Sequence, residues 1–167
     1  MADALLKKLQ GTPVCKGLSD DEMKELIGIA DESSAKQGAV LFSEGDKGDA
    51  LLLVLDGQVE VTKRSASLAK LEAGSVIGEM SLLDGETRSA TATTLSDVKF
   101  LTISNARFQK LLAADNVAAL KIVRNLAQVM SKRLALINEK LVDSLGKGTQ
   151  KKEELADFGR ILNRWSF

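Results

Sequence analysis

The sequence predicts an α+β domain in which an antiparallel β-sandwich or small barrel is flanked by helices. Between about residues 32 and 103, short apolar runs alternate with turns rich in Gly and Asp, which is typical of antiparallel strands. Before and after this region, apolar residues recur every three or four positions, as in amphipathic helices. The chain has 167 residues, of which 44% are hydrophobic, so it can bury one core of ordinary size.

The N-terminal region predicts two helices. The opening stretch MADALLKKLQ holds apolar residues at helical spacing and interrupts them with lysines, so it lacks the apolar core of a signal peptide or a membrane span. We therefore expect a cytoplasmic protein that does not enter a membrane. Ser19 and Glu22 have the spacing of a capping box. Because the apolar face continues to Ile27, a capped helix is expected over residues 19–29.

The central region predicts several strands and the start of the next helix. The stretches EGDKGD and DG lie on either side of the apolar run ALLLVL, the stretch QVEVTK alternates, and SLAKLEAG and ATATTLSDVKFLTI follow. These runs are the expected strands of the sandwich or barrel. At Ser104 the helical spacing returns, and this Ser is a suitable N-cap for the stretch NARFQKLLA.

The longest helical pattern covers residues 116–143 and contains neither Gly nor Pro. Its apolar residues form a seam with heptad spacing and a second row beside it. One neighbouring element seldom covers so wide an apolar face, so we expect one row to pack on the barrel and the other on a second copy of the chain. The alternative is a helix buried more deeply in its own domain. The seam consists of Leu120, Val123, Ala127, Met130, Leu134, Ile137 and Leu141, the second row of Ile122, Leu126, Val129 and Leu136, and the polar face of Lys121, Arg124, Asn125, Gln128, Lys132 and Asn138.

Residues 144–167 predict a separate amphipathic tail. The stretch GKGTQ at residues 146–150 is a flexible break, and the stretch after it places four large apolar residues on one helical face. We expect residues 150–167 to dock on the parent domain, on a protein partner, or at the mouth of a ligand site. The four residues are Leu155, Phe158, Leu162 and Trp165.

The composition removes several classes of function. One Cys excludes an internal disulfide, and the absence of His removes the commonest metal ligand and general base. With 23 basic and 23 acidic side chains, the net charge does not indicate nucleic-acid binding. No pair of nucleophile and base and no metal cluster is visible. We therefore expect no catalytic residues, metal ligands or cofactor, and no enzymatic activity.

The stretch GEMSLLDGETRSA at residues 78–90 holds residue types that suit a ligand with an anionic group. Gly78 allows the backbone to approach a ligand closely, and EMSLL is long enough for one helical turn with free N–H groups. Arg88 offers a fork of charged donors to phosphate oxygens, Glu79 can accept from a hydroxyl, and Ser89 offers an N–H and a hydroxyl. The set suits a sugar phosphate, although Glu and Arg at this spacing also commonly cap helices or face water.

Two longer runs resemble the cyclic nucleotide-binding domain family. They are LFSEGDKGDALLLVLDGQVEV and LEAGSVIGEMSLLDGETRSATATTLSDVKFLTISNARF, and the likeness covers about residues 10–140. Its most specific part is the phosphate-binding cassette, in which Gly-Glu, small and aliphatic residues, and Arg-Ser-Ala follow one another. The resemblance implies a jelly-roll barrel, or β-roll, at about residues 32–103, a long helix at about 115–143, and a domain over residues 1–143. The family's turn positions are occupied by Gly45, Gly48, Gly57 and Gly74.

The resemblance also implies a role for each cassette residue. In the family, the cassette Glu binds the ribose 2′-hydroxyl and the cassette Arg pairs with the exocyclic oxygens of the cyclic phosphate; these residues are Glu79 and Arg88 in this chain. Backbone N–H groups near Met80 and Ser89, with the Ser89 hydroxyl, complete the phosphate cradle, and Gly78 lets the chain pass close to the ligand. The implied ligand-binding residues of the cassette are Gly78, Glu79, Met80, Ser81, Arg88, Ser89 and Ala90.

Two further ligand contacts are implied on the long helix. In the bacterial catabolite activator branch this helix reaches over the purine, and matching the stretch SKRLALINEK to it puts Arg133 and Asn138 at or near the base-contacting positions. Asn can present a donor and an acceptor to an adenine edge, whereas a solvated polar face is the other interpretation of Asn138. Ser89 after the cassette Arg resembles the bacterial cAMP receptors, and Thr is frequent there in relatives with cGMP preference. We therefore expect cAMP as the ligand, with cGMP as the alternative.

The function implied by the resemblance is that of a stand-alone cytoplasmic cyclic nucleotide receptor, which signals by ligand-dependent repositioning of its C-terminal helices. Related bacterial regulators continue into a DNA-reading helix-turn-helix, whereas this chain ends soon after the long helix, so DNA is not expected as a partner. Two alternatives are an adaptor with the same fold that binds a protein but no nucleotide, and a receptor for a cyclic dinucleotide. The additional phosphate of a dinucleotide would favour further basic groups such as Arg124 or Arg133.

Overall fold

A computed structural model describes residues 2–84 and 87–145 of the chain. The chain forms two compact units, one up to Leu126 and one from Ala127 onwards. The expected domain boundary at residue 143 stays a prediction. The amphipathic tail also stays a prediction, because residues 146–167 lie outside the described residues.

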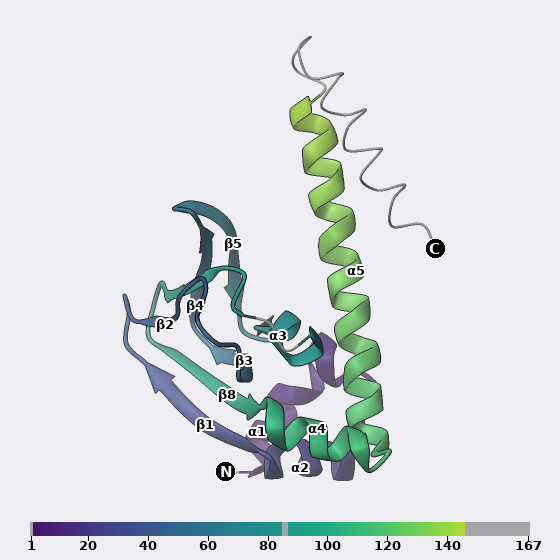
Figure 1. The fold of residues 1–167 in the computed structure, drawn as a ribbon. Helices are drawn as coiled ribbons and strands as arrows, with labels where there is room; N and C mark the ends of the chain where they lie inside the picture. The colour runs from purple at the N-terminus through teal and green to yellow at the C-terminus, as the bar shows by residue number, and fades with distance from the viewer. Residues whose placement is uncertain (1, 85–86, 146–167) are drawn as a thin grey trace. The chain divides into compact units, whose positions relative to one another are not determined.

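Eight strands in the described residues form two antiparallel sheets. They are β1 (Ala30–Ala35), β2 (Val40–Phe42), β3 (Ala50–Asp56), β4 (Gln58–Lys63), β5 (Ala66–Glu72), β6 (Val76–Ile77), β7 (Thr91–Thr94) and β8 (Val98–Ser104). One sheet has the order β1-β8-β3-β6 and the other the order β2-β7-β4-β5. The predicted antiparallel sandwich or barrel is therefore confirmed, and Figure 1 shows how the strands curve around one another.

Helices precede and follow the strands, as the spacing of apolar residues predicts, and one short helix lies between β6 and β7. They are α1 (Ala2–Gln10), the 3₁₀ helix η1 (Pro13–Cys15), α2 (Asp20–Gly28), α3 (Glu79–Asp84), α4 (Asn105–Ala113) and α5 (Val117–Leu145). The capping box is present: the Glu22 N–H donates to Ser19 Oγ at 3.2 Å, and the Ser19 N–H donates to a Glu22 carboxylate oxygen at 2.7 Å. Ser104 caps α4 by accepting from the Arg107 N–H at 3.2 Å. None of the described helices has an apolar run long enough to cross a membrane.

Strand β3 crosses the centre of the domain. Its residues from Ala50 to Leu55 are all buried. Because successive side chains of a strand point to opposite faces, this pattern means that both faces of β3 are covered. The apolar run ALLLVL is therefore a central strand and does not alternate as an edge strand would. Its residues join a core cluster of Leu52, Val54, Val59, Ile77, Ala92 and Val98, with the partly buried Leu41, Phe42, Leu71 and Phe100 packed against it.

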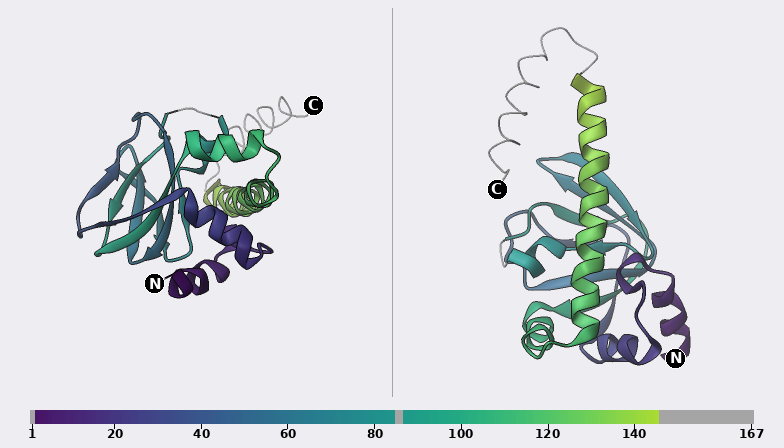
Figure 2. Two further views of the ribbon diagram at one scale, coloured as in Figure 1. Left: turned by 90° about the horizontal axis from the view of Figure 1, so that it is seen from below. Right: turned by 90° about the vertical axis from the view of Figure 1, so that its right-hand side faces the viewer.

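The first turns of α5 lie among the N-terminal helices and α4 (Figure 2). Ile122 and Leu126 of the predicted second row are almost fully buried, at 1% and 0% exposure, within the first unit. Leu120 of the predicted seam is 50% exposed in the same unit. In this unit the second row is therefore buried, whereas the seam is only partly covered: Leu120 is exposed and Val123 is half-buried.

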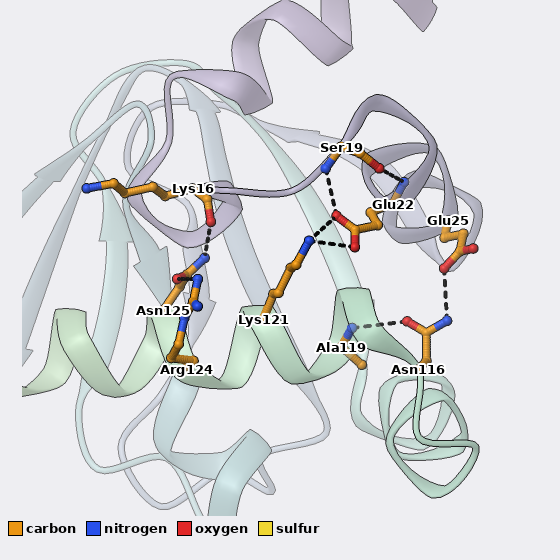
Figure 3. Close-up of polar contacts among 9 residues, drawn as sticks. All are labelled: Lys16, Ser19, Glu22, Glu25, Asn116, Ala119, Lys121, Arg124 and Asn125. Atoms are coloured by element: carbon orange, nitrogen blue, oxygen red, sulfur yellow. Dashed lines mark hydrogen bonds and ion pairs between the residues drawn. The ribbon is translucent and has the colours of Figure 1, made fainter.

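Asn125 is a buried polar residue on α5, with 2% of its surface exposed. Its amide nitrogen donates to the carbonyl oxygen of Val14 at 2.9 Å and to that of Lys16 at 2.8 Å, the second of which is drawn in Figure 3. Its amide oxygen accepts from Arg124 at 3.4 Å. Asn125, which the helical spacing assigned to the polar face of the long helix, is therefore buried in the protein. Its partners lie more than a hundred residues earlier, and helical spacing does not indicate them.

Two further side chains join the start of α5 to α2 (Figure 3). Lys121 Nζ donates to both carboxylate oxygens of Glu22, at 2.7 and 2.8 Å. The hydrogen bonds from Lys121 hold the pKa of Glu22 below its ordinary value. Asn116 donates to the Glu25 carboxylate at 2.9 Å and accepts from the Ala119 N–H at 3.1 Å, which caps α5. These contacts fix the beginning of α5 against the N-terminal segment.

Replacing Asn125 by Ala is expected to lower the free energy of unfolding by about 2–3 kcal/mol. The change removes the donor from the carbonyl groups of Val14 and Lys16, and an unsatisfied buried group costs about 1–3 kcal/mol. Urea unfolding followed by circular dichroism measures this difference. Gln128→Ala, at an exposed position of the same helix, is the control and should change stability by less than about 0.5 kcal/mol. Equal stability of the Asn125→Ala variant and the wild type would contradict this role of Asn125.

Candidate functional site

Gly78 connects β6 to α3 and has a positive φ of 84°. A Cβ at this position would overlap the Nη1 atom of Arg88 and would lie 3.0 Å from the carbonyl oxygen of Ala50. Only glycine adopts this φ without strain and also leaves the space that Arg88 occupies. The predicted helical turn of the stretch EMSLL follows directly as α3.

The backbone of Arg88 is held by the loop between β2 and β3. The Arg88 N–H donates to the carbonyl oxygen of Asp46 at 2.8 Å, and the Gly45 N–H donates to the carbonyl oxygen of Arg88 at 2.9 Å. An isolated antiparallel bridge between Lys47 and Thr87 lies beside these bonds. Arg88 is therefore fixed at its backbone, although it lies outside the named strands.

The guanidinium of Arg88 is buried, with 5% of the residue exposed. Its Cζ atom lies 4.2 Å from the centroid of the Phe42 ring. Its Nε and Nη1 atoms have no hydrogen-bond partner among the described residues. Because a buried donor without a partner costs free energy, this arrangement suits a site that receives an acceptor from a ligand.

The charge of Arg88 is balanced by nearby carboxylates. Burial lowers the pKa of Arg88, whereas the charges of Asp49, Asp46 and Glu79 act in the opposite direction. An arginine remains protonated at physiological pH even when its pKa falls moderately. The guanidinium is therefore a permanent cation in a mostly dry environment, where its attraction for an anion is larger than in water.

A cavity of about 330 Å³ adjoins the guanidinium. Its size is at the lower end of the range of small-molecule sites. One part of its wall is apolar and another is polar, as is usual for such sites. The lining residues are Leu41, Phe42, Asp46, Lys47, Asp49, Ala50, Leu52, Arg88, Phe100 and Thr102.

The predicted cassette residues come together from the two ends of the stretch at residues 78–90. Ser89 Oγ donates to the sulfur of Met80 at 3.6 Å, and Glu79 lies close enough to Arg88 for its charge to affect the pKa of that residue. Glu79 is half-buried, while Met80 and Ser89 are exposed. Ala90 is 7% exposed and is packed into the protein.

The site roles of three other predicted residues are not tested by the structure. Ser81 lies in α3, and its side chain is outside the described part of the chain. Arg133 and Asn138 are half-buried positions of α5 in the second unit. Their role in base recognition stays a prediction.

Residues that the sequence analysis did not assign to the site also surround Arg88. Phe42 and the carboxylates of Asp46 and Asp49 belong to the stretch LFSEGDKGD, of which only EGDKGD was interpreted, as a turn before the apolar run ALLLVL. An aromatic residue before an acidic, glycine-rich turn is the only local signal that these residues offer. Their proximity to Arg88 depends on the contact between the loop at residues 43–49 and the end of the cassette.

Comparison with protein-family models gives a match to the cyclic nucleotide-binding domain over residues 32–115, about half of the chain. Two of the curated proteins that are similar in sequence illustrate the range of relatives. The cyclic AMP receptor protein of Thermus thermophilus is 31% identical over 131 residues, which are 75% of this chain and 59% of that protein. The cGMP-dependent protein kinase egl-4 of Caenorhabditis briggsae is 33% identical over 101 residues, which are 60% of this chain and 14% of that protein.

A solved structure has a similar fold. The crystal structure of a cyclic nucleotide-binding domain from Methylobacillus flagellatus superposes with a TM-score of 0.77 at 29% sequence identity, and the match covers 86% of this chain and 85% of that one. By contrast, the chain spans between 13% and 59% of the length of the curated relatives that it matches.

Proposed function

The chain belongs to the cyclic nucleotide-binding domain family, and from this membership we propose that it is a cAMP receptor. One observation carries the proposal. The buried Nε and Nη1 atoms of Arg88 have no hydrogen-bond partner in the described residues, and the exocyclic oxygens of a cyclic phosphate would supply the missing acceptors. In this proposal Glu79, which directly follows Gly78, accepts from the ribose 2′-hydroxyl, and the Ser89 hydroxyl donates to the phosphate.

The choice of cAMP over cGMP rests on Ser89. Among the similar proteins, one is named a cyclic AMP receptor protein and another a cGMP-dependent protein kinase, so membership of the family alone leaves both ligands open. Ser at the position after the cassette Arg favours cAMP. The adaptor alternative is disfavoured because a scaffold gains nothing from a buried cation whose Nε and Nη1 donors have no hydrogen-bond partner among the described residues, which costs stability until an anion binds.

A thermal-shift panel of cAMP, cGMP, a cyclic dinucleotide and linear AMP tests the proposal. A ligand present at 100 times its Kd adds about 2.7 kcal/mol to the free energy of unfolding. For a chain of this length that stabilisation raises Tm by roughly 5–10 °C. We expect the largest shift with cAMP and a small shift with AMP, which lacks the cyclic phosphate. No shift with any cyclic nucleotide would contradict the proposal, and a shift with the dinucleotide alone would favour the second alternative.

We further propose that two copies of the chain associate through the seam of α5. Leu120, Leu134 and Ile137 of the seam are 50%, 58% and 60% exposed. Apolar side chains repeated at heptad spacing and left exposed suit a coiled-coil contact with an identical helix. A second copy is the expected occupant because the repeat continues over residues 116–143, a length that a parallel partner helix matches throughout.

Sedimentation equilibrium tests this association. The wild type is expected to be a dimer at micromolar concentrations, and Leu134→Glu is expected to be monomeric because the charge would be buried in the contact. Gln128→Glu, on the polar face, is the control and should leave the dimer intact. If the wild type were still monomeric at a protein concentration about 100 times higher than this micromolar range, the proposed dimer would be contradicted.

The proposed output is a change in position of the C-terminal helices when the nucleotide binds. The receptor is proposed to act in the cytoplasm, without enzymatic activity, and to pass its signal through the dimer or through a protein bound by residues 150–167. A ligand shifts a conformational equilibrium only by binding one state more tightly. Hydrogen exchange of residues 144–167 should therefore differ with and without cAMP. Identical exchange would contradict this output.

A further inference from the structure

Phe42 contacts both the buried core and the guanidinium of Arg88. It is the last residue of β2, where it pairs with Ala92 of β7, and the register shifts between Val40 and Phe42. Its ring packs against the buried core cluster that contains Leu52 and Ala92. It also faces the guanidinium of Arg88, with 4.2 Å between Cζ and the ring centroid. One side chain thus connects the rigid core to the charged group of the site.

The contact with an aromatic face has a chemical property that an ion pair lacks. The N–H donors of a guanidinium lie in its plane, at the edge of the group, whereas a ring attracts the cation at its face. A carboxylate would hold Arg88 by accepting from these donors and would compete with a ligand for them. The ring holds the guanidinium while Nε and Nη1 have no hydrogen-bond partner in the part of the chain that the structure describes.

Carboxylates that could capture the guanidinium are close by. Asp46, Asp49 and Glu79 are near enough to affect its charge state, and Asp46 and Asp49 line the same cavity as Phe42 and Arg88. Without an attractive face to lie on, the guanidinium could rotate and form an ion pair with one of these groups. Its donors would then no longer be open to a phosphate.

We propose that Phe42 is a positioning residue for Arg88, which fixes the plane of the guanidinium so that its Nε and Nη1 donors remain open to an anionic ligand. This inference rests on the proposed function, because it concerns the affinity for the cyclic phosphate. Phe42 is not proposed to contact the phosphate itself. Its effect on the affinity passes through Arg88.

Calorimetric titration with cAMP tests the inference on four proteins. Phe42→Leu removes the ring and is expected to weaken binding about tenfold, equal to about 1.4 kcal/mol. Phe42→Tyr keeps the ring and is expected to bind within about threefold of the wild type. Leu71→Ala is the matched control, because Leu71 packs against the same core cluster as Phe42 but is not among the residues that line the cavity beside Arg88. It is expected to bind within about threefold of the wild type.

A double-mutant cycle on the ligand-free protein gives an independent measurement. Unfolding in urea is compared for the wild type, Phe42→Leu, Arg88→Ala and the double variant. If ring and guanidinium attract each other, the two substitutions are not additive, and the coupling is expected to be about tenfold in the unfolding equilibrium constant. Should Phe42→Leu fail to fold, Phe42→Met replaces it, because Met is flexible enough to fill the gap in the core.

The possible results separate this inference from the proposed function. If the wild type binds no cyclic nucleotide, the proposed function fails. If the two substitutions are additive in the double-mutant cycle, the attraction between ring and guanidinium is overturned, whatever the result of the titration. If the wild type binds cAMP and folded Phe42→Leu binds equally well, the positioning role is overturned and the receptor proposal stands. An equal loss of affinity in Leu71→Ala would also overturn the positioning role, because the effect would then come from the core in general. No recovery of affinity in Phe42→Tyr would overturn it as well, because the effect would then not depend on the aromatic ring beside Arg88.

Discussion

Arg88→Ala is expected to weaken cAMP binding by roughly 100-fold, equal to about 2.8 kcal/mol. A hydrogen bond to a charged group contributes about 1.5–3 kcal/mol, and Arg88 has two buried donors, Nε and Nη1, without partners in the described residues. The stability of the ligand-free protein should change much less. The variant loses the contact with Phe42 but is also relieved of a buried cation.

Isothermal titration calorimetry of cAMP, together with urea unfolding, measures both effects. Arg88→Lys is expected to bind with intermediate affinity, since Lys keeps the charge but lacks the fork of donors. Arg107→Ala is the control, because Arg107 is an exposed arginine whose Nη1 lies 2.8 Å from Asp31. It should bind cAMP as the wild type does. An affinity of Arg88→Ala within threefold of the wild type would show that the buried guanidinium is not the phosphate site.

Gly78→Ala is expected to lower both the stability and the affinity for cAMP. The φ of 84° is unfavourable for Ala and costs about 1–2 kcal/mol of stability. The added Cβ would also occupy the place of the Arg88 Nη1 atom. The guanidinium must then move from its position beside the start of α3, so the affinity should fall by roughly tenfold or more.

Gly38→Ala separates the two effects of this substitution. Gly38 has a φ of 80°, and a Cβ there would meet nothing within 4 Å. The loss of stability caused by the positive φ should be similar in the two variants. The affinity for cAMP should fall in Gly78→Ala alone. Urea unfolding and calorimetry on both variants give the comparison. Unchanged affinity in folded Gly78→Ala would mean that the place of the guanidinium beside Gly78 is unimportant for binding.

The parts of the fold that depend on neighbouring residues could be predicted from the sequence. The capping box of Ser19 and Glu22, the Ser104 cap, and the helical turn after Gly78 all arise from residues within a few positions of one another. The strand runs were recognisable for the same reason. Their pairing was not, because the register of β1 with β8 joins Ala30 to Ile103 and is set by the packing of the whole core.

The parts of the site that depend on distant residues could not be predicted. Phe42 has the ordinary pattern of a strand residue, and its contact with Arg88 arises only when the loop at residues 43–49 binds the backbone of Arg88. The sequence around Asn125 suits an exposed polar helix face as well as a buried position. Its side chain can be buried because its amide donates to two carbonyl groups near the N-terminus. In both cases one residue type suits two environments, and the fold decides between them.

The most direct test of the account is the nuclear magnetic resonance signal of the Arg88 Nε–H group, assigned by its loss in Arg88→Lys and recorded with and without cAMP. We expect saturating cAMP to shift this proton signal to lower field and to slow its exchange with water, because the donor gains a charged acceptor. A signal that stays unchanged while calorimetry shows that cAMP is bound would contradict the claim that Arg88 binds the cyclic phosphate.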